Sequence, residues 1–444
     1  MEGVDSHDDM PSSPVILALL AILTQLAPST GYESMCDDSH ERLNEVTQYF
    51  AQQAITALDN ERLSIVGSSQ ASSYHPHVPL ELEASIACCV LSLYQYLCRG
   101  DIDQMTLLAH KALELFGRLP HSTETSLIES SPFAEACRRT WWMVYLCLCN
   151  ASAVSCKPLK AGIDIGTVRI PYPSIDHEKD IWCRYIRAEE TLVAATLLLV
   201  ALVTGINSEA AIPAFNRSLR TLKDLVSHQL AVLSTVPYVE HDESSSAETR
   251  LAHCLHILTR VRLMSARIKI HRYRAFMNDL RLLRRFEALA STGATQREQN
   301  TENRNSAHSM RGVSRIFPFE EIEARSICLQ SALEIANDLK QLSTAGTVAA
   351  PSVCSAMIAG YTLMMMSHFQ SSSTVANISS GTTHIKCKTG VATTVEVLDS
   401  YAIGSGFLMG LKGRSHMQQF HESIRLTFQI ADQLLTAAVA CKII

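Results

Sequence analysis

Hydrophobic residues recur with the spacing of an α-helix along most of the chain. The clearest example is a set on one helical face: Leu82, Ile86, Cys89, Leu93, Tyr96 and Leu97. Gly100 follows this set and is typical of a helix end. A second helix then begins at once, with Asp101 as its cap and Gly117 at its end. Its apolar face comprises Met105, Leu108, Ala109, Ala112 and Phe116. The two segments predict an αα-hairpin with a very short connection.

The same periodicity predicts a series of further helices. One begins near Pro132 and runs toward Ser155, and its core face comprises Ala134, Cys137, Trp141, Val144, Tyr145 and Leu148. Others are predicted near residues 176–206, 213–234, 250–290, 319–343, 352–370 and 415–441. Alternation typical of a β-strand is weak and confined to 383–399. We therefore predict an all-α fold, a multi-helix domain of packed αα-hairpins with long polar loops.

Polar stretches between the helices suggest how the chain is organised. Surface loops are predicted near 59–79, 118–131, 236–249, 290–316 and 371–390. The segment 290–316 has the composition of a disordered insertion. The predicted organisation has three parts: an acidic amino-terminal tail over 1–13, an all-α domain over 14–370, and a Ser/Thr-rich loop with a C-terminal helical segment over 371–444.

Two apolar runs raise the question of a membrane. Residues 14–28 follow a segment with four acidic residues and no Lys or Arg, whereas a signal peptide needs a positive charge there. Residues 191–206 include three Thr and a Gly, and their 16 positions are short of the roughly 18–20 apolar residues that a span needs. We therefore expect buried core segments and no membrane partner.

Charge is distributed unevenly along the chain. The net charge is −6, which argues against nucleic-acid binding through bulk charge. Between Arg250 and Arg285, however, ten basic residues face one acidic residue, Asp279, a local net charge of +9. A solvated helix face is the simpler explanation, because an amphipathic pattern is still traced there by Leu251, Leu255, Leu258, Arg262 and Ser265. The alternative is a nuclear-import or phosphate-contacting surface that comprises Arg260, Arg262, Arg267, Lys269, Arg272, Arg274, Arg281, Arg284 and Arg285.

Catalytic and metal-binding patterns are poorly represented. Fourteen cysteines include no C-x-x-C pair, and their use fits a reducing, intracellular compartment. Cys147, Cys149 and Cys156 are the densest group, and we expect them to pack in the core. His253 and His256 share a helical face without a nearby carboxylate ligand. The chain contains neither a G-x-S-x-G nor a G-x-x-x-x-G-K-[ST] motif, so we expect no enzyme, no metal site and no cofactor.

One stretch nevertheless resembles a known family. Its residues are Arg138, Arg139, Thr140, Trp141 and Trp142, then Lys157 and Pro158, then a short segment that ends in Pro171. They resemble the middle homology region of fungal binuclear zinc-cluster transcription factors, in which an R-R-x-[WF]-W helix leads to a G-R-P turn and a segment ending in proline. Two departures stand out, because Leu148 occupies a place where the family often has Asp, and Cys156-Lys157 replace Gly-Arg. The residues themselves predict simple packing roles, independently of the resemblance. Trp141 belongs to the core face of its helix, and we expect the Arg138–Arg139 pair to form a salt bridge to a neighbouring helix.

The resemblance implies a nuclear regulator of fungal transcription, for example of a biosynthetic gene cluster. The family contacts promoter DNA through a six-cysteine zinc cluster built from C-x-x-C pairs, and this sequence contains none. We therefore expect DNA contact only through such a head or through a partner protein, and zinc only in that head. The alternative function is that of a headless co-regulator or repressor that heterodimerises with a full-length zinc-cluster factor. Both functions are compatible with a homo- or heterodimer.

Overall fold

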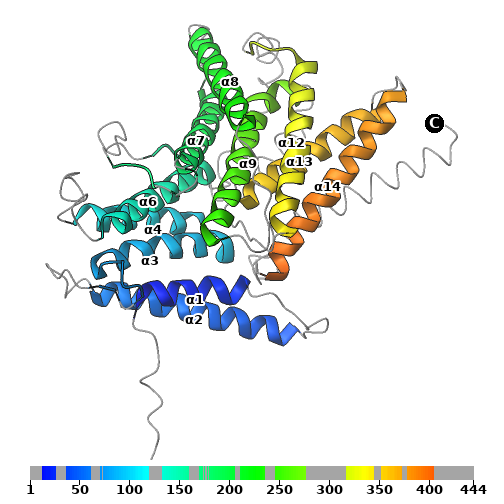
Figure 1. Ribbon diagram of the computed structural model, residues 1–444. Coiled ribbons are helices and arrows are strands. Elements are labelled where there is room, and N and C mark those ends of the chain that lie inside the picture. Colours follow the sequence, from blue (N-terminus) through cyan, green and yellow to red (C-terminus); the bar gives the residue numbers. More distant parts are fainter. Residues whose placement is uncertain are drawn as a thin grey trace, which may run out of the picture. The chain divides into compact units, whose positions relative to one another are not determined.

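The described part of the chain is predominantly helical. The computed structural model describes residues 13–26, 37–61, 71–72, 74–119, 133–159, 170–173, 175, 178, 180–205, 211–235, 246–276, 317–344, 352–372 and 378–404. Within these ranges it contains eleven α-helices, one π-helical turn and no strand (Figure 1). The all-α prediction is confirmed.

The chain divides into two compact units. Unit 1 comprises Met1–Cys183 with Tyr401–Gly410, and unit 2 comprises Arg184–Ser400 with Leu411–Ile444. The boundary between 183 and 184 falls inside one helix, so sequence periodicity gave no sign of it.

Unit 1 is organised around the predicted αα-hairpin. Its helices are α1 (Pro14–Leu26), α2 (Asp37–Glu61), α3 (Leu80–Tyr94) with the π-helical turn η1 (Gln95–Arg99), α4 (Ile102–Gly117) and α6 (Ala134–Ser155). Helix α3 packs against α1, α4 and α6.

The connection between α3 and α4 forms as predicted. Gly100 has a φ of 65°, in the left-handed region that glycine adopts at little cost. Asp101 caps α4 by accepting a hydrogen bond from the backbone N–H of Gln104 at 2.9 Å. Two buried hydroxyls tie the helices together, since Ser85 donates to the Ala112 carbonyl at 2.8 Å and Ser92 to the Met105 carbonyl at 2.9 Å.

Unit 2 surrounds one long helix. Its helices are α7 (Ile181–Gly205, which starts in unit 1), α8 (Ile212–Ser234), α9 (Ala247–Phe276), α12 (Glu321–Thr344), α13 (Val353–Ser372) and α14 (Ile378–Gly404). Helix α9 packs against α8, α12 and α13, most extensively against α12. More than half of its residues are buried, which explains why its sequence looks less amphipathic than that of a surface helix.

Several predicted boundaries are wrong. The β pattern over 383–399 belongs to helix α14, in which Cys387, Val391, Thr394 and Val397 are buried at helical spacing. The brief alternation was too short to decide between the two periods. The predicted loop 371–390 is wrong from residue 378 onward, and the loop 59–79 overlaps the end of α2, a helix that the sequence analysis missed. The predicted helix 415–441, the insertion 290–316 and the end of the helix 250–290 lie outside the described residues.

One described helix meets the length and hydropathy criteria of a membrane span. It covers Leu80–Arg99, has a mean hydropathy of 1.2, and 61% of it is buried within the protein. A helix at the centre of a packed unit has the same composition, so this is weak support for a membrane. The described parts of the two apolar runs considered from the sequence do not meet the criteria: Pro14–Thr24 is a shorter apolar helix, and residues 191–205 are part of α7.

Candidate functional site

The arginine pair of the family-like motif lies at the edge of α6. Both guanidinium groups bind one carboxylate, since Arg138 Nε lies 3.0 Å from Glu135 Oε2 and Arg139 Nε lies 2.7 Å from Glu135 Oε1. The predicted salt bridge therefore forms, but within the same helix rather than to a neighbouring one. Because these side chains are between 25% and 47% exposed, the contacts contribute only a few tenths of a kcal/mol each.

Thr140 and Trp141 belong to the core of unit 1. Both are buried, and the Trp141 ring lies 5.5 Å from the ring of Phe116 on α4. Among the described residues, Trp141 Nε1 has no hydrogen-bond partner. The prediction that Trp141 fills the core face is confirmed.

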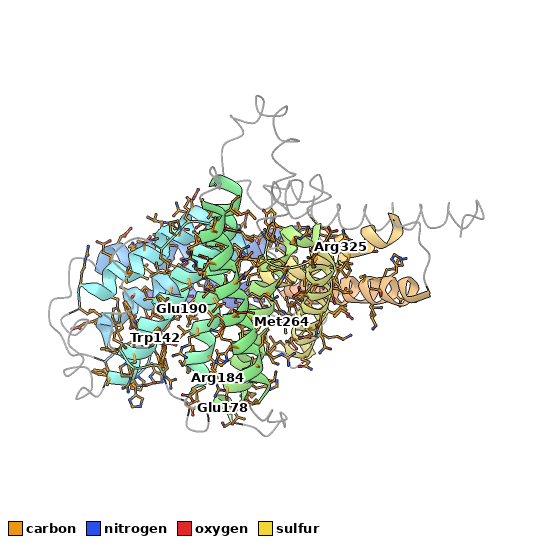
Figure 2. All side chains as sticks on the ribbon, turned by 90° about the horizontal axis from the view of Figure 1, so that it is seen from above. Trp142, Glu178, Arg184, Glu190, Met264 and Arg325 are labelled. Carbon is orange, nitrogen blue, oxygen red and sulfur yellow. The ribbon has the colours of Figure 1, made fainter. Side chains whose placement is uncertain are left out.

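Trp142 connects the motif helix to the segment that follows it by 29 residues. Figure 2 labels Trp142 among the side chains of the protein. Its indole Nε1 donates to the Pro171 carbonyl at 2.9 Å, and its ring stacks on Tyr172 with centroids 4.5 Å apart. A buried indole N–H needs an acceptor, and this bond supplies one at a point where the chain is not helical. Pro158 and Pro171 are themselves exposed, so they shape the chain rather than fill the core.

The turn after α6 holds an unusual backbone conformation. Cys156 has a φ of 57°, and it is the one described non-glycine residue with a positive φ. The next residue is held by Ser152, whose hydroxyl donates to the Lys157 carbonyl at 2.6 Å. Cys156 is exposed, so the expectation that it packs in the core is wrong. It follows the last helical residue, and a helix end places this position at the surface.

The other thiols of the group are buried as expected. Cys147 and Cys149 lie in the core of unit 1, and the Cys147 thiol donates to the Cys89 carbonyl at 3.8 Å. The hydrogen bond with the Cys147 side chain, together with burial, raises the pKa of Cys89 well above its usual value. A thiol with a raised pKa is a poor nucleophile and a poor metal ligand, which favours a packing role.

The predicted basic surface is the main correction, and Arg262 shows why. Its side chain is 2% exposed, and its Nε lies 2.6 Å from Oε1 of Glu189 on α7. Its Nη1 also donates to Ser355 Oγ on α13 at 3.5 Å. A buried arginine of this kind holds helices together and cannot contact a phosphate in this structure.

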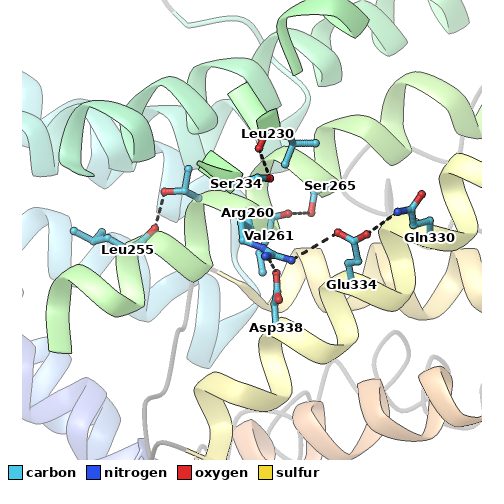
Figure 3. A network of polar contacts seen from close by, with 10 residues as sticks. Leu230, Ser234, Leu255, Arg260, Val261, Ser265, Gln330, Glu334 and Asp338 are labelled. Carbon is cyan, nitrogen blue, oxygen red and sulfur yellow. Dashed lines mark hydrogen bonds and ion pairs between the residues drawn. The ribbon is translucent and has the colours of Figure 1, made fainter. Parts of the chain in front are cut away.

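Arg260 binds two acidic residues of α12. Its Nε donates to Asp338 Oδ2 at 3.1 Å, and its Nη2 lies 3.7 Å from Glu334 Oε2 (Figure 3). Gln330 donates to the other oxygen of Glu334 at 3.0 Å and extends the network along α12. Burial raises the pKa of Asp338 to about 6, although the charge of Arg260 lowers it in part.

Three more described basic residues of this run make contacts within unit 2. Lys269 donates to Thr196 at 2.7 Å, Arg274 donates to the Phe319 carbonyl at 3.2 Å, and the guanidinium of Arg272 lies 5.4 Å from the centre of the Tyr273 ring. Together with Arg267, they are at most partly exposed. Arg262 is buried, and Arg260, Lys269 and Arg274 contact other elements of unit 2. The described part of the run, 260–274, therefore does not form an open phosphate-contacting surface. Arg281, Arg284 and Arg285 lie outside the described residues.

The histidines of α9 form no recognisable metal site. Within the described ranges, no three His, Cys, Asp or Glu side chains are placed to hold an ion. Burial, followed by the nearby charge of Arg260, lowers the pKa of His256. His271 is buried with its ring 4.3 Å from Phe319, and burial lowers its pKa to about 3, so it is neutral at physiological pH.

Sequence reasoning missed the acidic partners of the basic run. Glu189 lies in a strongly apolar helix and Asp338 lies between residues of α12 that read as amphipathic, and both are buried. A charged residue on the apolar face of a predicted helix is the available signal, but it does not identify the partner across 73 or 78 residues.

Comparison with known proteins gives no matching family model, no matching curated protein and no matching solved structure.

Proposed function

We propose that this chain is the regulatory domain of a fungal zinc-cluster-type transcriptional regulator that acts in the nucleus. The observation that carries the proposal is the bond between Trp142 and Pro171. It joins the R-R-x-W-W helix to the proline that ends the family-like segment, so the separate parts of the motif form one packed unit. If the short motifs matched the family by chance, their separate parts would not be expected to lie in contact.

The backbone of Cys156 gives independent support. The resembled family has glycine at this place, and Cys156 adopts the left-handed conformation that favours glycine. The turn therefore has the geometry that a Gly-Arg-Pro sequence suits, although its residues differ.

In this proposal the domain is non-enzymatic and contributes regulation rather than DNA contact. The sequence contains no C-x-x-C pair, so zinc and base recognition would belong to a six-cysteine head or to a partner protein. Arg260 and Arg262 of α9 bind acidic residues of unit 2, so they lend no support to direct phosphate contact. Control of a biosynthetic gene cluster is one form that this regulation could take.

A co-regulator that heterodimerises with a full-length zinc-cluster factor is the second candidate. It is favoured by exposed apolar side chains on α8, where Leu225 is 42% and Val232 is 40% exposed. These residues are seven apart and share one face of the helix, as contact residues between helices do. The lack of a C-x-x-C pair also suits a protein that reaches DNA through its partner.

A tethering experiment tests the first proposal. The full chain is fused to a heterologous DNA-binding domain in a fungal host, and transcription is measured from one silent and one active reporter that carry the matching site. We expect one of the two to change relative to the DNA-binding domain alone. Unchanged transcription from both, with the fusion present in the nucleus at equal amounts, would contradict the proposal.

One further measurement separates the two candidates, and a second tests both of them. Co-precipitation with a full-length zinc-cluster factor, lost in Leu225→Ser/Val232→Ser but kept in the exposed control Leu107→Ser on α4, would support the co-regulator. A mobility-shift assay tests the absence of direct DNA contact. Specific binding of a promoter duplex by the purified chain, without metal or partner, would overturn both versions.

A further inference from the structure

Unit 1 contains a buried polar centre that the proposed function does not use. Glu83 on α3 is 1% exposed, and each of its carboxylate oxygens accepts a hydrogen bond from a serine hydroxyl. Ser13 donates to Oε2 at 2.5 Å, and Ser72 donates to Oε1. Because a buried carboxylate is costly unless it is hydrogen-bonded, these hydroxyls stabilise the centre.

The two serines are held in different ways. Ser72 is held by two hydrogen bonds to nearby residues of its own segment. Its backbone N–H donates to the Val78 carbonyl at 2.8 Å, and its Oγ accepts from the Tyr74 N–H at 2.9 Å. Ser13 stands just before α1, and its carbonyl accepts the first helical hydrogen bond, from Leu17 at 3.1 Å. The hydroxyl of Ser13 thus links the amino end of α1 to α3, whereas Ser72 belongs to a separate segment before α3.

The sequence at this position matches a class of modifying enzyme. Ser13 is followed by Pro14, the first residue of α1. A serine followed by proline is the minimal recognition sequence of proline-directed protein kinases. Pro14 also disfavours a helical conformation at Ser13. Because Ser13 is 3% exposed, the start of the helix must open before a kinase can reach the hydroxyl, and helix ends open more readily than helix centres.

We propose that Ser13 is the target of a proline-directed serine/threonine kinase, and that its phosphorylation separates the amino end of α1 from α3. In this step Ser13 Oγ attacks the γ-phosphorus of ATP, the bond from that phosphorus to the β–γ bridging oxygen breaks, and ADP leaves. The hydroxyl proton passes to the base of the kinase. This inference goes beyond the proposed function and holds for any function of the chain.

The product cannot keep the contact that Ser13 makes. A phosphoserine carries about −1.5 to −2 charges at pH 7, and its ester oxygen has no proton to donate to Glu83. Two anionic groups would then lie side by side in a buried place, where their repulsion is weakly screened. Moving α1 away relieves this repulsion and uncovers an apolar face, in which Val15, Leu17, Ala18 and Ala21 are at most 4% exposed. The modification would thus loosen unit 1 at α1.

The experiment uses the full chain and its second Ser-Pro sequence, Ser131-Pro132, as an internal reference. The protein is incubated with ATP and a purified cyclin-dependent kinase, sites are identified by mass spectrometry, and amide hydrogen exchange is measured in peptides covering 14–26. We expect phosphate on Ser13 and faster exchange in α1. The increase should persist in Ser131→Ala and disappear in Ser13→Ala. Phosphate on Ser131 but none on Ser13 would overturn the kinase assignment.

A variant of the acceptor tests the mechanism. In Glu83→Gln the neutral amide can donate to the phosphate, so phosphorylation of Ser13 should increase exchange in α1 less than it does in the parent protein. Comparing each variant before and after phosphorylation cancels any loss of stability that the substitution itself causes. Phosphorylated Ser13 with unchanged exchange in the parent, or an equal increase in Glu83→Gln, would overturn the proposed separation.

Discussion

The two units stabilise a buried carboxylate in different ways. Glu83 of unit 1 accepts hydrogen bonds from two neutral hydroxyls, and both of its oxygens are satisfied. Glu189 of unit 2 faces a full positive charge on Arg262, and both side chains are almost completely buried. Among the described residues, Glu189 Oε2 and Arg262 Nη2 have no hydrogen-bond partner.

This difference predicts how much stability each buried polar centre loses when one of its groups is removed. An ion pair in a low-dielectric interior is strong, but either partner left alone is a bare buried charge. A carboxylate held by hydroxyls loses one hydrogen bond at a time, at about 1–3 kcal/mol each. Unit 2 should therefore be the more sensitive of the two to a single change at its polar centre, whereas the polar centre of unit 1 should lose stability in smaller steps.

The largest expected effect comes from removing one charge of unit 2. Arg262→Met leaves Glu189 buried without its counter-charge and should lower the free energy of unfolding by about 3–5 kcal/mol. Urea unfolding, with hydrogen exchange in α9 to locate the effect, measures it. The double variant Arg262→Met/Glu189→Leu should recover most of the loss, because no bare charge remains. If Arg262→Met costs no more than Glu83→Gln in unit 1, the contrast between the two centres is wrong.

A pH dependence with an unusual sign is expected from Asp338. Its pKa is raised to about 6 in the folded protein against 3.8 for the ordinary value, so the folded state binds the proton more tightly than the unfolded state. Its contribution to stability is therefore complete below about pH 4 and is lost as the pH rises through about 6. Asp338→Asn stays neutral, and at pH 7 it should be more stable than the parent by up to about 3 kcal/mol.

Thermal unfolding between pH 4 and 7 checks this prediction. The parent should lose stability relative to Asp338→Asn as the pH rises, and the gap should close at the acidic end. Glu334→Gln is the matched control, because Glu334 contacts the same arginine but its side chain is 30% exposed, so its effect should be small. A variant Asp338→Asn that is less stable than the parent at pH 7 would mean that the bond to Arg260 outweighs the cost of burial.

The same contrast shows what the sequence could predict. Apolar periodicity located the α3–α4 hairpin, the cap at Asp101 and the end of α6, because these depend on local spacing and on turn residues. It could not predict that Arg262 is buried. A positively charged side chain on a helix is expected to be exposed unless an acidic side chain packs against it, and the acidic partner, Glu189, lies 73 residues away in the sequence. The sequence identified Trp142 as a residue of the motif. It could not predict the hydrogen bond from Trp142 to the Pro171 carbonyl, because that bond depends on how the chain between these two residues folds.

Close packing in unit 2 gives the next prediction. A Cβ added at Gly390 on α14 would lie 2.9 Å from side-chain atoms of both Leu333 and Leu363, so both leucines would have to move. Gly390→Ala should therefore lower the free energy of unfolding by about 1–3 kcal/mol despite the better helix propensity of alanine. Gly117→Ala on α4 of unit 1 is the matched control, since no atom lies within 4 Å of its added Cβ. The control should be neutral or stabilising by up to about 1 kcal/mol, and chemical denaturation of both variants measures the difference.

The smallest expected effect lies in unit 1, where Cys156 holds a left-handed backbone at φ 57°. This conformation costs a non-glycine residue roughly 1–2 kcal/mol. Glycine removes that cost but has more freedom to lose on folding, so Cys156→Gly should stabilise the protein by about 1 kcal/mol or less. Cys156→Ser keeps the Cβ and should leave the melting temperature unchanged, which separates the backbone effect from loss of the thiol. Equal melting temperatures for the glycine and serine variants would show that the turn is not strained, and the resemblance to a Gly-Arg-Pro turn would then lose its support from backbone geometry.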